Sequence, residues 1–222
     1  MNRTPWALWD LPSGQPAEGA DTAEAIAVLE TAFVALPGAW DHPGLLHMYI
    51  HLMEMSPYPE RALRHGDRLA TLVPDAGHLL HMPTHIDVLC GDYQNVVARN
   101  QLAIEADEKY LAKKGPHNFY SIYRCHNYHF KIYGAMFLGQ PTPALDAAQA
   151  LIDNLPRDVL EPMADWFEGF IPMKQHVLIR FGRWADILAQ PLPADPELYA
   201  VTTAMMHYAR TVALSNSGDL NA

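Results

Sequence analysis

Residues 78–97 read HLLHMPTHIDVLCGDYQNVV, and this stretch contains the pattern on which the fold depends. A helical run ends at Gly91-Asp92-Tyr93, and a second helical run follows from Gln94 to Leu111. A glycine directly after a helix supplies the left-handed conformation that caps the helix end. The second run carries apolar residues at helical spacing, namely Val97, Leu102, Ile104 and Leu111. The stretch therefore predicts two consecutive helices joined by a tight turn.

Turns of this kind recur along the chain, each between two helical runs: Gly139-Gln140-Pro141, Gly182-Arg183-Trp184 and Gly218-Asp219-Leu220. A small residue often stands five positions after a turn, where two helices must approach closely: Ala25, Ala62 and Ala144. A proline stands about seventeen positions after some of the turns: Pro37, Pro74 and Pro156. Apolar/polar alternation of the strand type is nearly absent. The pattern predicts an array of helical hairpins.

This pattern resembles the tetratricopeptide-repeat (TPR) family, whose repeats are helix pairs of about 34 residues with a Gly-Asp-Tyr-type turn. The resemblance implies an all-α, TPR-like α-α helical-hairpin repeat solenoid, a right-handed superhelix, forming a single domain over residues 1–222. The expected elements are a helix at 22–36, hairpins at about 43–73, 77–113, 117–155 and 160–190, and a final helix at about 196–215. The stretches His78–Asp92 and His126–Phe130 also resemble larger bacterial TPR proteins with an HxxHMPxHI motif.

The two ends of this expected array are open, because each lacks the partner of a helix pair. Repeat arrays need end caps with a polar outer face. We therefore expect a fragment of a longer protein, or self-association through the open repeat ends. The alternative is that residues 1–20 fold back as an irregular cap, with Trp6 and Trp9 as its apolar content.

Composition excludes several classes of protein. Half of the 222 residues are hydrophobic and 18% are charged, which is typical of globular proteins. A formal net charge of −10 argues against a nucleic-acid partner, which requires clustered Lys and Arg. No apolar stretch approaches the roughly 20 residues of a membrane span. Two cysteines without metal-type spacing, Cys90 and Cys125, and the absence of a secretory signal favour the cytoplasm.

Histidine is the unusual residue type, with twelve in the chain. An earlier turn, Ser56-Pro57, falls in register with the glycine turns. Counted back from the turn residues Pro57, Gly91, Gly139 and Gly182, histidines recur at offsets of six, ten and thirteen residues. Positions separated by three, four and seven residues share one face of a helix. Eight histidines occupy these offsets: His47, His51, His78, His81, His85, His126, His129 and His176. In the TPR family the equivalent positions face the concave groove, so the resemblance implies a histidine-lined groove.

We expect these histidines to bind a transition metal, because two imidazoles one helical turn apart can chelate one ion. The candidate ligands are His47, His51, His81, His85, His126 and His129, followed by His78 and Glu54. Imidazole suits Zn, Cu or Fe, and the sequence does not identify the metal. Two alternatives stay open: a polar ligand groove without metal, and hydrogen-bonded histidines of the core. Inside a helix, Pro83 would clash with the carbonyl group of Leu79. Pro83 therefore has two interpretations: it kinks a helix, or a helix starts there.

Two functions from different classes follow from this site. The first is a mono- or dinuclear metalloenzyme, oxidative or hydrolytic, in which Tyr133 and Tyr123 are candidate proton donors. The second is a non-catalytic TPR interaction scaffold that binds a protein or peptide partner in the groove. The Lys and Arg side chains with which TPR grooves hold acidic peptide ends are scarce at these offsets, which favours the metal hypothesis.

Overall fold

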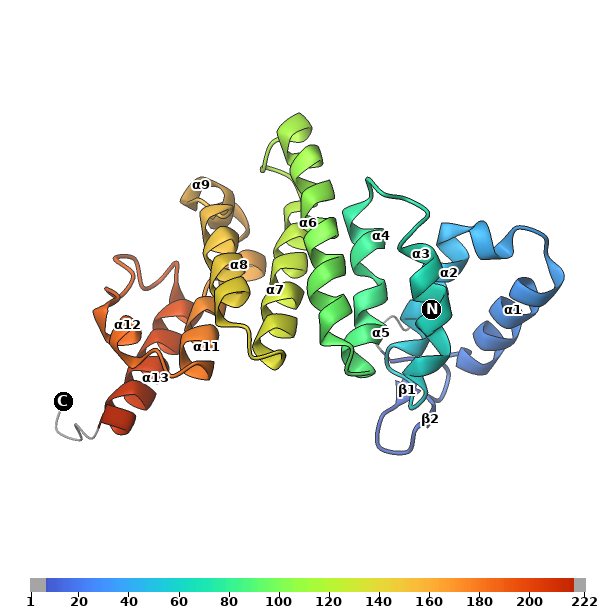
Figure 1. Ribbon diagram of the computed structural model, residues 1–222, viewed down its shortest axis with the longest axis horizontal. Helices are drawn as coiled ribbons and strands as arrows, with labels where there is room; N and C mark the ends of the chain where they lie inside the picture. The colour runs from blue at the N-terminus through green and yellow to red at the C-terminus, as the bar shows by residue number, and fades with distance from the viewer. Residues whose placement is uncertain (1–6, 218–222) are drawn as a thin grey trace. The chain divides into compact units, whose positions relative to one another are not determined.

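The computed structural model describes residues 7–217, and these residues are mostly helical, with 70% of them in helices (Figure 1). The strands within the described residues are short: β1 (Trp9–Asp10) pairs antiparallel with β2 (Gln15–Pro16). The expectation of an all-α chain is confirmed at this level. The chain divides into two compact units, Met1–Lys109 and Tyr110–Ala222, and each is described by itself.

The N-terminal unit is built from helices and short 3-10 turns. Its elements are α1 (Thr22–Ala35), η1 (Ala39–Asp41), α2 (Pro43–Met53), η2 (Pro59–Ala62), α3 (Leu63–Leu69), α4 (Gly77–His81), α5 (Pro83–Leu89) and α6 (Tyr93–Lys114), whose last turn belongs to the second unit. Helix α2 packs on α1, α3 and α5, and α3 also packs on α5. The helix expected at 22–36 corresponds to α1, and the hairpin expected at about 43–73 contains α2 and α3.

The core of this unit forms around α2. Leu46, Ile50 and Met53 follow one another at spacings of four and three, so they share one face, and all three are fully buried. The β1–β2 hairpin also contributes: Trp9 is buried, and its indole N–H donates to the Leu52 carbonyl at 2.7 Å. Trp6, the other apolar residue expected in an N-terminal cap, lies outside the described residues.

The C-terminal unit continues with helix pairs. Its elements are α7 (Ser121–Phe137), α8 (Pro141–Asp153), α9 (Arg157–Leu160), η3 (Glu161–Met163), α10 (Ala164–Phe167), η4 (Glu168–Phe170), α11 (Met173–Arg180), α12 (Trp184–Ala189) and α13 (Ala200–Ser217). Helix α7 packs on α8, α8 on α11, and α11 and α12 on α13. The buried Glu168 carboxylate accepts hydrogen bonds from the backbone N–H groups of Val201 and Thr202, at 3.1 and 2.6 Å, and so caps the start of α13.

The expected turn glycines have the left-handed backbone that the sequence predicts. Gly91, Gly139 and Gly182 have φ angles of +79°, +68° and +63°. Each follows a helix, namely α5, α7 and α11, so the proposed helix caps are confirmed at these three turns. Gly218 lies outside the described residues.

Pro83 begins α5, and α4 ends at His81. Met82, between the two helices, keeps helical dihedral angles of −50° and −38°. Of the two interpretations of Pro83, the structure shows the helix start, with proline in the first turn where no N–H is needed. His81 and His85 therefore lie on successive short helices instead of one continuous helix.

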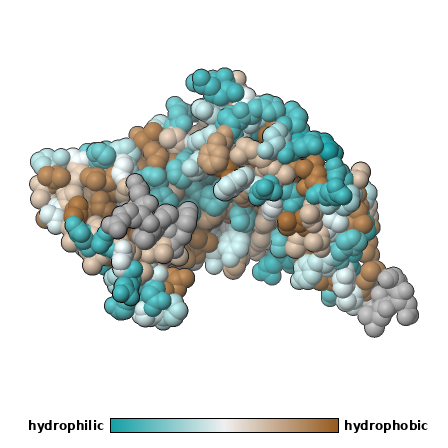
Figure 2. All heavy atoms as spheres, turned by 180° about the vertical axis from the view of Figure 1, so that it is seen from behind, coloured by the Kyte–Doolittle hydropathy of each residue, from teal (hydrophilic) through white to brown (hydrophobic). Residues whose placement is uncertain are grey.

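Apolar and polar side chains are mixed on the surface of the N-terminal unit, seen at the left of Figure 2. Val28 and Val34 of α1 are exposed, but scattered apolar residues are normal on protein surfaces. Among the described residues, no helix has the length and apolarity needed to cross a membrane.

The start of α4 approaches α6 so closely that only glycine fits at position 77. A Cβ at Gly77 would lie 2.0 Å from an Asp107 carboxylate oxygen and 2.9 Å from the Ala103 carbonyl. We expect Gly77→Ala to destabilise the protein by about 1–3 kcal/mol, the range for overpacking a tight contact. Urea unfolding measures this loss. Gly169→Ala is the matched control, because no atom lies within 4 Å of its added Cβ; equal stability of the two variants would contradict the close approach.

Candidate metal centre

Five of the predicted histidines converge in the N-terminal unit. His47 and His51 lie on α2, His78 and His81 on α4, and His85 on α5. Ring centroids are 4.7 Å apart for His47 and His51, 5.1 Å for His47 and His78, and 4.8 Å for His81 and His85. The five rings form a continuous group, since His78 and His81 are 6.3 Å apart and His51 and His85 also 6.3 Å.

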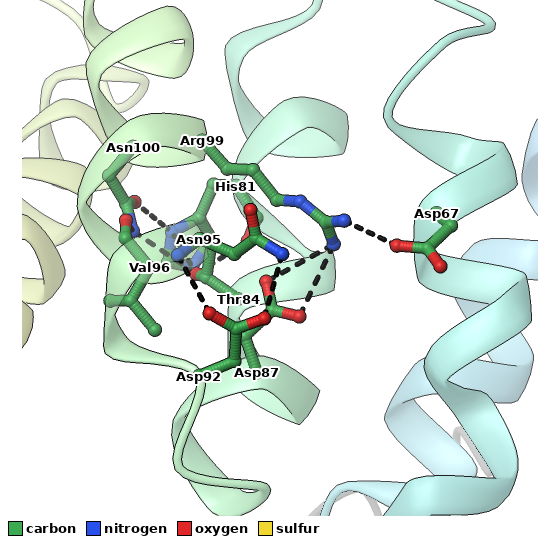
Figure 3. Close-up of polar contacts among 9 residues, drawn as sticks. All are labelled: Asp67, His81, Thr84, Asp87, Asp92, Asn95, Val96, Arg99 and Asn100. Atoms are coloured by element: carbon green, nitrogen blue, oxygen red, sulfur yellow. Dashed lines mark hydrogen bonds and ion pairs between the residues drawn. The ribbon is translucent and has the colours of Figure 1, made fainter.

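The proton position on His81 follows from its neighbours in Figure 3. The Asn100 amide nitrogen donates to the Val96 carbonyl at 2.8 Å and to the Thr84 hydroxyl at 3.2 Å. The Thr84 hydroxyl in turn donates to the His81 carbonyl at 2.7 Å. Asn100 Oδ1 is therefore the acceptor that lies 2.7 Å from His81 Nδ1, and Nδ1 must carry the proton. His81 Nε2 is left with a lone pair.

Glu54 determines the proton positions on two further rings. Its Oε1 lies 2.7 Å from His51 Nδ1, and its Oε2 lies 2.6 Å from His85 Nδ1. Burial by itself raises the pKa of Glu54, but the hydrogen bonds and charges of His51 and His85 outweigh burial and lower the pKa to about 2. The carboxylate is thus ionised at neutral pH and accepts both Nδ1–H groups, which leaves Nε2 of each ring with a lone pair when the ring is neutral.

These hydrogen bonds place two ring nitrogens that both carry a lone pair against each other. His81 Nε2 and His85 Nε2 are 2.9 Å apart. Because both Nδ1 atoms carry the proton, neither neutral ring has a hydrogen to donate between the two Nε2 atoms. Their lone pairs would repel each other, and a cation between them removes that conflict. Two nitrogens bound to one ion at about 2.1 Å are about 3.0 Å apart at a right angle and about 3.4 Å apart in a tetrahedron.

His47, His51 and His78 form a second group. Each offers one ring nitrogen, and these three atoms lie within 4.8 Å of one another. Burial, followed by the nearby His51, lowers the pKa of His47 to about 4. Burial, followed by the nearby His47, also lowers the pKa of His78 to about 4. Both rings are therefore neutral at pH 7, which is the form that binds metals.

Ion pairs hold α5 in position beside these groups (Figure 3). Arg99 of α6 contacts Asp87 of α5, with nitrogen–oxygen distances of 3.3 and 3.1 Å, and also pairs with Asp67 of α3. Burial raises the pKa of Asp87 to about 7, although Arg99 opposes the shift. The Arg99 guanidinium thus links α3, α5 and α6 beside the histidines.

The remaining predicted site residues belong to the C-terminal unit. His126 and His129 lie on α7 with ring centroids 6.3 Å apart, and burial, followed by the nearby His176, lowers the pKa of His129. Tyr133 is 40% exposed and packs on Phe137. Tyr123 contacts Phe119 and Tyr120. That these four residues share one site with the histidines of α2, α4 and α5 stays a prediction.

Asn100 is a site residue that the histidine pattern does not predict, although the sequence contains a signal for it. Val96, Asn100, Ala103 and Asp107 follow at spacings of four, three and four, and all are buried. The helix that Leu102 helped to indicate is present, but Leu102 itself is 52% exposed, so the buried face runs through other residues. A polar residue on the buried face of a helix needs a partner, and this rule would have pointed to Asn100.

Comparisons with known proteins do not add a function. No family model matches the chain, and no curated protein or solved structure matches it. The case for a function therefore depends on the geometry of the residues themselves.

His65 is a histidine of a different kind. It lies on α3, is buried, and has ring centroids of Phe33, Trp40 and Tyr49 at 4.7, 4.7 and 4.1 Å. Burial in this apolar setting lowers the pKa of His65 to about 4. His65 is best understood as part of the core packing.

The pKa of His65 predicts a pH dependence of stability. Because the folded pKa is about 4 and the ordinary value is 6.5, the unfolded chain binds more protons between these pH values. We therefore expect His65 to make the wild-type protein less stable as the pH falls from 6.5 towards 4. The His65→Phe variant should lose less stability than wild type over the same range. Urea unfolding at pH 7 and pH 5 measures the difference. His207→Ala, which replaces an exposed histidine, should retain the wild-type dependence; equal slopes in all three proteins would refute this role of His65.

The network around Asn100 predicts an effect on His81. Asn100→Leu should remove the acceptor of the buried His81 Nδ1–H and cost about 1–3 kcal/mol, the penalty for an unsatisfied buried polar group. In wild-type apoprotein, side-chain ¹⁵N NMR should show His81 protonated at Nδ1. Gln101→Ala, on the next position of α6, should change stability little, because its hydrogen bond to Glu105 is exposed. Protonation of His81 at Nε2 alone would contradict the assignment.

Proposed function

We propose that the N-terminal unit binds a transition-metal ion through its histidines, with His81 and His85 as the central ligands. The observation that carries the proposal is the 2.9 Å contact between their Nε2 atoms, both of which the neighbouring hydrogen bonds leave with lone pairs. Two lone pairs at this distance repel each other when no cation is bound, and both can bind a cation placed between them.

The surroundings of the two rings support the same proposal. Histidines that bind metals usually donate the other ring N–H to a carboxylate or carbonyl group, which fixes the ring and raises its basicity. His85 donates to the Glu54 carboxylate and His81 to the Asn100 amide oxygen. Glu54 was expected as a ligand; with both oxygens bound by imidazoles, it acts here as the group that orients ligands.

The donor set favours a particular class of metal. The convergent atoms are imidazole nitrogens, which suit Zn, Cu, Fe and Ni and are poor ligands for Mg or Ca. His85 and His51 are partly exposed, with 19% and 24% of their side chains accessible, so an ion and a water ligand can reach the centre. A bound ion would supply Lewis-acid or redox chemistry at this position.

A shared proton between His81 and His85 is the competing explanation. One protonated imidazole would also convert the 2.9 Å contact into a hydrogen bond. The two explanations differ in metal content and in their response to metal, which an experiment separates.

We also infer that the helix pairs belong to a TPR-like repeat. Left-handed glycines after α5, α7 and α11 support this inference, as does the packing of successive helices within each unit. In such a repeat the histidines of α2, α4 and α5 would lie on the first helices of successive pairs. In TPR proteins these first helices line the groove that binds ligands.

The metal proposal predicts the composition of the purified protein. Untagged protein prepared anaerobically should contain Zn, Cu, Fe or another first-row transition metal, and metal-free protein should regain it on titration with Zn²⁺ or Co²⁺. His85→Ala should bind at least tenfold more weakly, because one central ligand is lost. His207→Ala, an exposed histidine on α13, should bind as wild type does.

Elemental analysis and the visible absorption of bound Co²⁺ measure both results. Absence of metal as purified, together with no binding of either ion at neutral pH, would overturn the proposal and leave the shared proton as the explanation of the His81–His85 contact.

A further inference from the structure

The histidines of the N-terminal unit form two groups, and each group is large enough to take part in a metal site. The first is the pair His81 and His85, with Nε2 atoms 2.9 Å apart. The second consists of His47, His51 and His78, each with one ring nitrogen within 4.8 Å of the others. We propose that the unit holds two transition-metal ions, one in each group, joined through Glu54. This inference rests on the proposed function and extends it to the number and roles of the ions.

The second group has the geometry of a three-histidine site. His47 and His51 lie one helical turn apart on α2, and His78 of α4 faces His47 edge-on with a centroid distance of 5.1 Å. Nitrogens around a tetrahedral ion are about 3.4 Å apart, so rotation of the rings by small side-chain adjustments would close the triad on an ion. Three imidazoles and a water form a common zinc coordination set.

His47 supplies an independent indication that the second group is incomplete without a ligand. Its Nε2 atom is buried, and within the described residues it has no hydrogen-bond partner. A buried polar atom without a partner costs about 1–3 kcal/mol. An ion among the three rings would satisfy this nitrogen, whereas an apolar neighbour would not.

One ion cannot use all five rings. Structural and catalytic sites for Zn are almost always four-coordinate, and five imidazoles would exceed that number. Two ions can share the five rings, with two imidazoles on one ion and three on the other. Water completes the coordination of each ion.

Glu54 connects the two proposed metal positions. Its Oε1 accepts from His51, which belongs to the second group, and its Oε2 accepts from His85, which belongs to the first. The carboxylate therefore orients one ligand of each ion and places a negative charge near both. That charge reduces the repulsion between two dications, which is the main electrostatic cost of a two-ion centre.

Glu54 is thus a positioning residue for both ions. In Glu54→Gln, the amide oxygen can still accept one Nδ1–H, but the amide nitrogen can only donate. One of the two histidines would have to turn or move its proton to Nε2, where it blocks metal binding. We therefore expect Glu54→Gln to weaken binding at one position more than at the other.

The number of bound ions tests the inference. Metal-free wild-type protein, dialysed to equilibrium against Co²⁺ under anaerobic conditions, should bind two ions per chain by elemental analysis. The double variant His47→Ala/His78→Ala should bind one, because the His81–His85 pair and Glu54 remain. His207→Ala, the exposed control, should bind two. Circular dichroism verifies that each variant retains its helices.

A second measurement does not depend on any variant. Wild-type protein loaded with Cu²⁺ should show an electron paramagnetic resonance signal broadened or reduced by coupling between two nearby ions, and sub-stoichiometric loading should sharpen it. A single bound ion with an uncoupled signal, unchanged in His47→Ala/His78→Ala, would overturn the two-ion inference while leaving the proposed function intact. Absence of any binding would overturn both.

Discussion

Both oxygens of the Glu54 carboxylate accept hydrogen bonds from imidazoles of different helices, His51 on α2 and His85 on α5. This interaction keeps a largely buried carboxylate ionised and holds two rings in one orientation each. Since Nδ1 of both rings faces the carboxylate, Nε2 is the nitrogen that each ring can offer to a metal ion, and Nε2 of His85 lies 2.9 Å from Nε2 of His81. The chemistry available to the cluster depends on this arrangement, because the exposed nitrogen of an imidazole decides what it can bind.

Asn100 of α6 orients the ring of His81 in the same way, by accepting its Nδ1–H. Its amide is fully used by Val96, Thr84 and His81, and a fully satisfied buried network of this kind specifies a single arrangement of side chains. The His81 Nδ1–H is satisfied by Asn100, while the contact between the Nε2 atoms of His81 and His85 opposes two lone pairs. Local conflicts inside an otherwise consistent structure are typical of functional sites.

The two units use buried carboxylates differently. Glu168 in the C-terminal unit accepts from two backbone N–H groups at the start of α13, and these donors have no second atom to offer a ligand. Its role ends with the helix cap. Glu54 accepts from two side chains, each with a second ring nitrogen. The same buried charge therefore stabilises a helix in one unit and prepares a candidate metal centre in the other.

The sequence by itself determined the helices, the left-handed turns at Gly91, Gly139 and Gly182, and the sharing of helix faces by the histidines, because these depend on local periodicity and backbone conformation. The tertiary structure decided which partners those histidines have. Asn100 reaches His81 from nineteen residues away, and Glu54 reaches His85 from another helix. Which ring nitrogen carries the proton depends on such long-range contacts, and no spacing rule along the chain contains them.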